Sequence, residues 1–356
     1  MSLTSIILCM TIALIVGTTL AKPSDPQPVR TYNVDIDAPA EVRWSQVLAD
    51  YQYMVPNILQ DVRTLIPVDY IPLVEKIADD IETYISQPFA GELKAIAKAW
   101  DIDLGEIVLL NIIYDVTAFC TSIVAQDGNG TIWHVRNLDY YYGDLLRNLT
   151  IMVNFQRQGK TVYTATTYAG YVGIVSGQRP NAFTVTVNQR GHHVHVGYWW
   201  QNILIAIVDK NSHFVSFLVR QVLENSTTYN DAVDQLSTQI IHAPVYYIVG
   251  GINPGEGVVI TRNRFAWVDK LYLNLPYRVW YVLETNYDNW SNPPPYDNQR
   301  RAVAKASMNK LGSDGVNKDS LYQVVSTKPV MNMNTTYTIV FSASQPEVYT
   351  SWIRWP

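Results

Sequence analysis

The hydrophobic pattern of this chain changes its period near Cys120. Before this point, apolar residues recur every three or four positions, a spacing that places them on one face of a helix. After it, apolar and polar residues alternate in short runs, which is typical of strands with one buried face. A helical first part followed by a larger strand-rich part indicates an α+β fold. No linker rich in proline or glycine separates the two parts, so we expect them to pack as one unit.

The first part contains three expected helices, at 41–65, 71–85 and 88–100, and Pro56 should kink the first of them. The larger part mixes strands with helices. Its expected strands are 131–136, 150–156, 161–168, 182–187, 245–249 and 258–261, and its expected helices are 198–223, 228–239 and 299–311.

The first 21 residues resemble a secretory signal peptide. The apolar run at 6–16 is too short to cross a bilayer, small residues follow it, and cleavage is expected after Ala21. Residues 1–5 lack the usual lysine or arginine. No later stretch approaches the roughly 20 apolar residues of a membrane span, so we expect a soluble protein of the secretory pathway. Glycosylation acceptor triplets favour the same route and occur at Asn129, Asn148, Asn225, Asn289 and Asn334.

Composition narrows the class of protein. Hydrophobic residues make up 48% of the chain and charged residues 16%, which is enough apolar material for a large core and excludes a disordered chain. The net charge of −5 and the lack of a basic block argue against nucleic acid as a partner.

Cys120 is the only cysteine after residue 21. Secreted proteins usually pair their thiols, so an unpaired thiol is either a buried, inert side chain or a nucleophile. Free cysteine is among the most buried residue types, and 119–124 could be a plain core strand.

The hairpin that follows Cys120 favours the nucleophile. Residues 127–130 have the composition of a four-residue turn, which would place Thr131 opposite Gln126 and hence Asn137 opposite Cys120. Arg136 would then lie beside the thiol, with Asp139 just beyond. A guanidinium next to a cysteine favours the thiolate, and a nearby carboxylate can hold the guanidinium in place. The alternative is a structural ion pair at the mouth of the hairpin.

His192, His193 and His195 form a cluster, but no carboxylate or thiol lies near them at ligand spacing. A polar loop or strand edge explains the cluster better, and we expect no metal site.

Eight short runs spread over nearly the whole chain after residue 21 form a specific set: QPFAGE at 87–92, CTSIVAQD at 120–127, HVRNLDY at 134–140, AGYVG at 169–173, YYIVGG at 246–251, GVVITRNR at 257–264, TNYD at 285–288 and RR at 300–301. Together they closely resemble the lysosomal N-acylethanolamine-hydrolysing acid amidases and acid ceramidases. These enzymes are N-terminal nucleophile hydrolases related to choloylglycine hydrolases.

The resemblance implies an αββα sandwich preceded by a helical N-terminal segment, made as an inactive precursor that cuts itself between Phe119 and Cys120. Residues 22–119 would form a helical α subunit. Residues 120–356 would form a β subunit that carries the catalytic core, and the two would remain one composite domain. With no second cysteine available, the two subunits would be held together non-covalently.

The resemblance also implies the roles of single residues. Cys120 would be the nucleophile and its new α-amine the proton relay, Arg136 would stabilise the thiolate, and Asp139 would orient the amine. Asn286 would donate to the oxyanion, and Arg300 would complete the charge network. Tyr140 and Gln189 are the implied substrate-binding residues, and no metal or organic cofactor is required.

Two features of the sequence bear on the substrate. The family often has glutamate where this chain has Gln189, so any acid role there is lost. Residues 136–150 continue without the insertion found in ceramidases, which favours long-chain N-acylethanolamines, whereas 223–229 and 326–330 look more like ceramidase. We therefore expect a lysosomal N-acylethanolamine hydrolase, with ceramide as the alternative substrate. Residues 68–73 and 198–200 are candidates for a peripheral membrane contact, with core packing as the alternative for the helical stripes.

Overall fold

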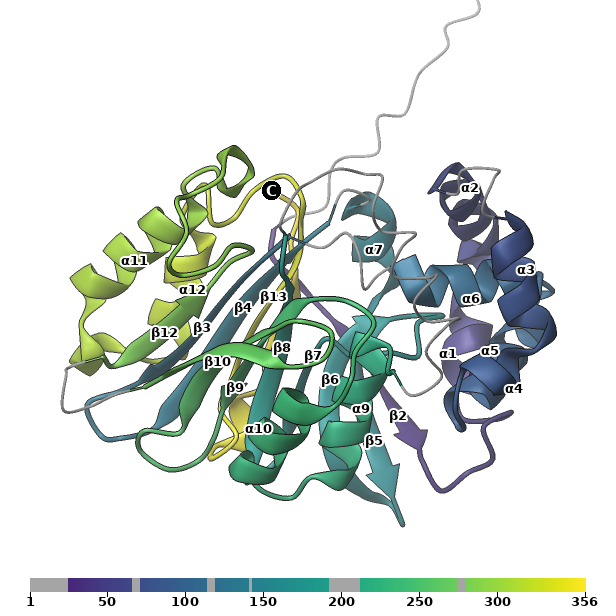
Figure 1. The fold of residues 1–356 in the computed structure, drawn as a ribbon, viewed down its shortest axis with the longest axis horizontal. Helices are drawn as coiled ribbons and strands as arrows, with labels where there is room; N and C mark the ends of the chain where they lie inside the picture. Colours follow the sequence, from purple (N-terminus) through teal and green to yellow (C-terminus); the bar gives the residue numbers. More distant parts are fainter. Residues whose placement is uncertain (1–24, 66–70, 114–118, 141–142, 192–211, 274–278) are drawn as a thin grey trace, which may run out of the picture.

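Two β-sheets lie face to face in the computed structural model, with helices on both outer sides (Figure 1). The structure describes residues 25–65, 71–113, 119–140, 143–191, 212–273 and 279–356. This arrangement confirms the predicted αββα sandwich. Several predicted features lie outside the described residues: the signal peptide, the cluster of His192, His193 and His195, and the membrane candidate at 198–200. The same holds for residues 68–70 of the candidate at 68–73 and for the first half of the helix expected at 198–223.

The first sheet has six strands in the order β1-β14-β13-β4-β3-β12. All neighbouring strands in it are antiparallel, and β3 and β4 form the hairpin at its centre. The bounds are β1 Gln27–Pro28, β14 Thr350–Ile353, β13 Thr335–Phe341, β4 Ile132–Asp139, β3 Phe119–Gln126 and β12 Tyr281–Glu284.

The second sheet has eight strands in the order β11-β10-β9-β8-β7-β6-β5-β2. Its neighbours are antiparallel except for β2, which pairs with β5 in parallel. The bounds are β11 Trp267–Tyr272, β10 Gly257–Arg262, β9 Val245–Gly250, β8 Phe183–Gln189, β7 Ser176–Arg179, β6 Lys160–Tyr168, β5 Thr150–Arg157 and β2 Arg30–Asp35.

Helices cover the outer face of each sheet. On the six-stranded sheet, α11 (Arg300–Leu311) and α12 (Lys318–Ser326) pack over Ile123, Ala125 and Val135. On the eight-stranded sheet lie α9 (Val215–Asn225) and α10 (Tyr229–Thr238), and the helices of the first part stand beside them (Figure 1). These are α1 Ser45–Tyr51, α2 Val55–Leu65, α3 Ile71–Asp79, α4 Ile81–Tyr84, α5 Phe89–Trp100 and α6 Leu104–Ile113, and the short α7 (Gly143–Leu149) follows β4.

The first part differs from its expected form in several ways. The helix predicted at 71–85 is divided into α3 and α4 at Asp80, and α6 was not expected. The helix predicted at 41–65 is split by a 3₁₀ turn at Gln52–Met54, so the break falls just before Pro56, which becomes the second residue of α2. The first part is also not purely helical, because β1 and β2 add a strand to each sheet. In β2 the side chains of Tyr32 and Val34 are buried while their neighbours are exposed, the alternation of a strand with one covered face.

The strands predicted after Cys120 are confirmed to within about three residues. Eight further elements were not predicted from the sequence: α6, α7, β7, β11, β12, α12, β13 and β14. Three of these, β12, β13 and β14, complete the six-stranded sheet around the hairpin.

The parts before and after Cys120 share one hydrophobic core. At its centre, the buried carboxylate of Glu92 on α5 accepts hydrogen bonds from both terminal nitrogens of Arg220 on α9, at 2.5 and 2.7 Å. Glu92 also accepts one from the indole of Trp44, at 2.7 Å. Within the described ranges, none of the helices has the length and apolar character that a bilayer crossing requires.

Candidate active site

Cys120 is the second residue of β3 and is completely buried. Side chains alternate along a strand, so Cys120, Ser122 and Val124 point to the same face. Ser122 identifies that face, because its hydroxyl donates to Asn188 on β8 of the other sheet, at 2.9 Å. The thiol therefore lies between the two sheets, where side chains from both can reach it.

The register predicted for the hairpin was wrong by one residue. Cys120 pairs with Leu138, not with Asn137, and Gln126 pairs with Ile132. The turn is one residue longer than expected because Asp127 organises it: its backbone N–H donates to the Thr131 carbonyl, and its carboxylate accepts from the Thr131 N–H.

The neighbour predicted for the thiol is nevertheless present. Arg136 lies opposite Ser122, so it is the diagonal neighbour of Cys120 on the same face of the sheet. Its Nη2 donates to the Cys120 Sγ over 3.0 Å. The guanidinium also donates to the carbonyls of Val175, at 2.5 Å, and Val187, at 2.9 Å, and to the Ser176 hydroxyl. These contacts, from β8 and the region of β7, fix the cation against the sulfur.

Burial raises the pKa of the Cys120 thiol in the uncut chain, and the charges of Arg136 and Arg300 oppose that rise. The carboxylate of Asp139 acts in the same direction as burial. The thiol is thus held next to the cations that would stabilise its thiolate, in a site that water does not reach.

Asp139 ends β4 and is buried. Its two carboxylate oxygens accept from the Thr335 hydroxyl at 2.7 Å and from the Asn332 amide at 2.9 Å, and Arg300 lies 3.7 Å away. Burial raises the pKa of Asp139, while Arg300 and the two hydrogen bonds oppose the rise. Thr335 and Asn332 were not identified in the sequence analysis, and no motif there marks them.

Asn286 follows β12 and binds the backbone of the nucleophile. Its Oδ1 accepts from the Cys120 N–H at 2.9 Å and from Arg300 at 3.0 Å, and its Nδ2 donates to the Gln189 carbonyl at 2.9 Å. Two donors on one side of the amide and an acceptor on the other fix its orientation.

Arg300 is the first residue of α11 and binds the backbone carbonyl of the nucleophile. Its Nη1 donates to the Cys120 carbonyl at 2.7 Å, and its guanidinium carbon lies 5.9 Å from the centre of the Phe119 ring. The structure thus brings together all five residues predicted to be catalytic: Cys120, Arg136, Asp139, Asn286 and Arg300.

The remaining predicted residues lie around this centre. Phe119 pairs with Asp139 across the hairpin, and its ring lies 6.1 Å from that of Tyr296. Tyr140 is buried directly after β4, and its N–H donates to the Asn334 carbonyl. Gln189 is half-buried at the end of β8 and contacts Asn286 through its backbone carbonyl.

The glycosylation acceptors differ in their exposure. Asn129, Asn148 and Asn225 are exposed, whereas Asn334 is half-buried. Asn289 is also half-buried, and its amide donates to Glu284 and accepts from Arg301. A sugar on Asn289 would have to replace those contacts. Among the described side chains, no three His, Cys, Asp or Glu residues come together as a metal-binding group.

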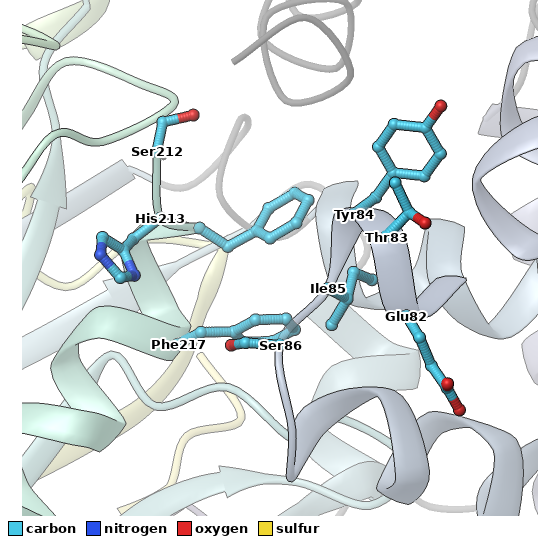
Figure 2. A pocket seen from close by; sticks show the side chains of 9 residues that line it. Glu82, Thr83, Tyr84, Ile85, Ser86, Ser212, His213 and Phe217 are labelled. Carbon is cyan, nitrogen blue, oxygen red and sulfur yellow. The ribbon is translucent and has the colours of Figure 1, made fainter. Parts of the chain in front are cut away.

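A pocket lies at the junction of the two parts of the chain and is separate from these residues. Figure 2 shows Tyr84, Ile85 and Ser86 on one side of it and His213 and Phe217 on the other. Phe217 also stacks on Phe89 of α5, with 4.3 Å between ring centres. None of the five predicted catalytic residues lines this pocket.

Comparison with known proteins finds two family models that match the chain. The family model described as linear amide C–N hydrolases, choloylglycine hydrolase family, matches residues 120–314. A second model, described as the beta subunit of N-acylethanolamine-hydrolyzing acid amidase, matches residues 27–85. That description gives the name beta subunit to the segment before Cys120, whereas the sequence analysis used it for the segment after. We therefore call the two segments the N-terminal and C-terminal parts.

The chain is similar to curated proteins over most of their length. It is 40% identical to rat N-acylethanolamine-hydrolyzing acid amidase, over 91% of this chain and 89% of the relative. It is 36% identical to acid ceramidase from Pan troglodytes, over 92% and 88%. Among solved structures, the Caenorhabditis elegans N-acylethanolamine-hydrolyzing acid amidase ortholog matches at 38% identity with a TM-score of 0.60, covering 66% of this chain and 99% of that chain.

Proposed function

The chain belongs to the choloylglycine hydrolase family of linear amide C–N hydrolases, and from that premise we propose that it cuts itself between Phe119 and Cys120 and then hydrolyses long-chain N-acylethanolamines. The observation that carries this proposal is the set of contacts on Cys120. Its sulfur, its N–H and its carbonyl are bound by Arg136, Asn286 and Arg300, respectively. A structural cysteine would need partners for its backbone N–H and carbonyl, but it would not need a buried guanidinium on its sulfur.

Self-cleavage would begin with attack of the Cys120 sulfur on the carbonyl carbon of Phe119. A C–S bond forms, the C–N bond of the peptide breaks, and the nitrogen takes up a proton to become the α-amine of Cys120. Water then hydrolyses the thioester, which releases the carboxylate of Phe119 and regenerates the thiol.

The new amine supplies the acid and base for the second reaction. An α-amine has a pKa of about 7.7–8.0, low enough to relay a proton between the thiol and the leaving amine of the substrate. Cys120 attacks the amide carbonyl, the leaving ethanolamine takes the proton, and water releases the fatty acid from the acyl-enzyme. No metal or organic cofactor is needed for these steps.

Asn286 would serve both the amine and the oxyanion. Its Oδ1 already accepts from the nitrogen that becomes the amine. The amide group carries two protons, so one can stay on the Gln189 carbonyl while the other stabilises the tetrahedral intermediate. Asp139, held by Thr335 and Asn332, would orient the amine together with Arg300. Tyr140 and Gln189, beside this centre, would contact the substrate.

Ceramide is the second candidate substrate. The relatives named as acid ceramidase are 35–36% identical to this chain, against 40% for rat N-acylethanolamine-hydrolyzing acid amidase. The difference favours N-acylethanolamines. Release of fatty acid from both lipids at acidic pH would decide between them, and faster turnover of ceramide would reverse the order.

We further propose that the mature enzyme is a non-covalent pair, residues 22–119 and 120–356, in the lysosome, reached by the secretory pathway. A second thiol for a disulfide is absent from the sequence after residue 21. The shared core and the Glu92–Arg220 pair supply the alternative means of association. Glycosylation at the exposed acceptors Asn129, Asn148 and Asn225 would accompany this route, and peripheral contact with a membrane would give access to lipid.

Intact-mass analysis and a denaturing gel after incubation at acidic pH test the central claim. The wild type should yield two fragments, the second beginning at Cys120, and should then release fatty acid from an N-acylethanolamine. Cys120→Ser removes the thiolate nucleophile and should slow or abolish both reactions. A wild-type chain that remains whole and inactive would refute the proposal.

A further inference from the structure

Residues from two of the runs noted in the sequence meet Arg190 in a cluster that none of the roles above uses. Arg190 follows Gln189, Asn263 belongs to the run at 257–264, and Asp288 ends the run at 285–288. In the structure the side chains of Asn263 and Asp288 both accept hydrogen bonds from the guanidinium of Arg190.

The centre of this cluster is a two-point ion pair. Arg190 Nε donates to Asp288 Oδ1 at 2.7 Å, and Nη2 donates to Oδ2 at 2.8 Å. The Tyr246 hydroxyl donates to Oδ1 at 2.6 Å, and Arg190 Nη1 donates to the Asn263 side-chain oxygen at 2.6 Å. Arg190 and Asp288 are 5% and 3% exposed, so water hardly competes for the ion pair between them. Paired, parallel hydrogen bonds of this kind fix geometry as well as contributing energy.

This pair joins the two chain segments that hold Asn286. Its neighbours in the first segment bind Asn286 directly: the Gln189 carbonyl accepts from Nδ2 at 2.9 Å, and the Gly191 N–H donates to the Asn286 carbonyl at 3.1 Å. Asp288 is two residues after Asn286 in the second segment. The ion pair therefore lies one residue from the first contact and two residues from the side chain that it would orient.

We propose that Arg190 and Asp288 are positioning residues that hold the Asn286 amide at the angle needed to bind the Cys120 amine and the oxyanion. This inference rests on the proposed function and adds two residues to it that never touch the substrate. Their effect should fall mainly on Asn286, because two of the three contacts that fix Arg136, those to Val175 and Ser176, come from the region of β7 and not from the segment that carries Arg190.

Because the effect should fall on Asn286 and not on the thiol, kcat and the alkylation rate of Cys120 should respond differently. A general loss of stability would not produce this difference. In Arg190→Met, kcat for an N-acylethanolamine should fall about 100-fold, the cost typical of a displacement of about 1 Å in a catalytic group. KM should stay within about threefold, since uniform binding is not removed. Alkylation of Cys120 by iodoacetamide should proceed at nearly the wild-type rate, because Arg136 and the thiol are undisturbed.

Arg43→Met is the matched control. Arg43 is a half-buried arginine that, like Arg190, makes several hydrogen bonds: it donates to Glu92 and to the carbonyls of Ala38 and Ile36 in the N-terminal part. Its loss should lower the melting temperature without changing kcat. If Arg190→Met does not fold, two milder variants extend the test. Asp288→Asn removes the charge of the carboxylate, and Tyr246→Phe removes one hydrogen bond to it. Both should lower kcat, with Asp288→Asn the more affected.

Three outcomes would overturn the inference. One is full kcat in Asp288→Asn and in folded Arg190→Met. Another is a loss of alkylation rate in proportion to the loss of kcat, because the pair would then act on the whole site. A wild type that neither cleaves itself nor hydrolyses the lipid would refute the proposed function itself, and this inference with it.

Discussion

The guanidinium of Arg136 lies directly against the Cys120 thiol, with Nη2 3.0 Å from Sγ and both side chains fully buried. Burial works against a thiolate, and the cation offsets it. The balance depends on contacts that reach Arg136 from the other sheet, so the chemistry of the thiol depends on the stacking of the two sheets.

Removal of that cation should raise the pKa of the thiol further. In Arg136→Gln, the midpoint of the pH profile for Cys120 alkylation should move up by at least about one unit, the shift typical of a close opposite charge. The alkylation rate at acidic pH should fall about tenfold for each unit. Arg136→Lys keeps the charge and should recover part of the rate. An unchanged midpoint in folded Arg136→Gln would contradict the role given to Arg136.

The sequence predicted this pair correctly in spite of the error in register. Cys120 and Arg136 are separated by a short hairpin, and a shift of one residue still left them as neighbours on one face. Asn286 and Arg300 are distant in sequence, and the family resemblance rather than any local pattern identified them. For the same reason the supports of Asp139 were missed: Asn332 and Thr335 are 193 and 196 residues away and reach Asp139 only because β13 pairs with β4.

The fold shows a similar limit. Alternation and helical spacing identify single elements, so the central strands and α5 were predicted well. They do not identify partners, and β1 and β2 were not expected to extend the two sheets. That pairing matters for function, because it ties the N-terminal part to β14 and β5 after the proposed cut.

Arg300 links the nucleophile to the rest of the charge network and should be needed for self-cleavage. In Arg300→Gln, the Cys120 carbonyl and the Asn286 Oδ1 each lose a buried donor, and such a loss costs about 1–3 kcal/mol per group. Two such losses total at least about 2 kcal/mol, and 1.4 kcal/mol corresponds to a factor of ten, so cleavage followed by gel densitometry should slow at least about 25-fold. Lys310→Gln, an exposed change on the same helix, should leave the rate unaltered. Equal rates in the two variants would contradict this role.

The Glu92–Arg220 pair should hold the two parts together. Arg220→Met leaves the Glu92 carboxylate buried with Arg43 as its remaining cation, and removal of one partner of a buried pair typically costs about 3–5 kcal/mol. The melting temperature should drop, and the two fragments should separate on size-exclusion chromatography after cleavage. Arg157→Met breaks exposed pairs with Glu224 and, between the two parts, with Asp37; being exposed, each should cost at most about 1 kcal/mol. Co-elution of fragments in Arg220→Met at an unchanged melting temperature would contradict the prediction.

Glu284 should make the folded state more stable in acid than at neutral pH. Burial raises the pKa of Glu284 to about 8, although it is paired with Arg301. An unfolded glutamate titrates near 4.5. Between these two values the folded chain holds a proton that the unfolded chain has lost, so the free energy of unfolding falls as pH rises. The loss should be on the order of a few kcal/mol and should be complete above about pH 8.

Two buried histidines change the free energy of unfolding with pH in the opposite direction. The effect of Glu284 therefore has to be measured against a variant that keeps both histidines. Burial lowers the pKa of His134, and it lowers that of His242 to about 3, so both favour the folded state at higher pH and withdraw that support as pH falls below about 6.5. Glu284→Gln leaves these histidines unchanged and mimics the protonated carboxyl. The melting temperature of the wild type relative to this variant should therefore fall from pH 5 to pH 8, as measured by differential scanning calorimetry on Cys120→Ser backgrounds that prevent cleavage. Parallel pH profiles for the two proteins would show that Glu284 is ionised in the folded state throughout this range, and would contradict the prediction.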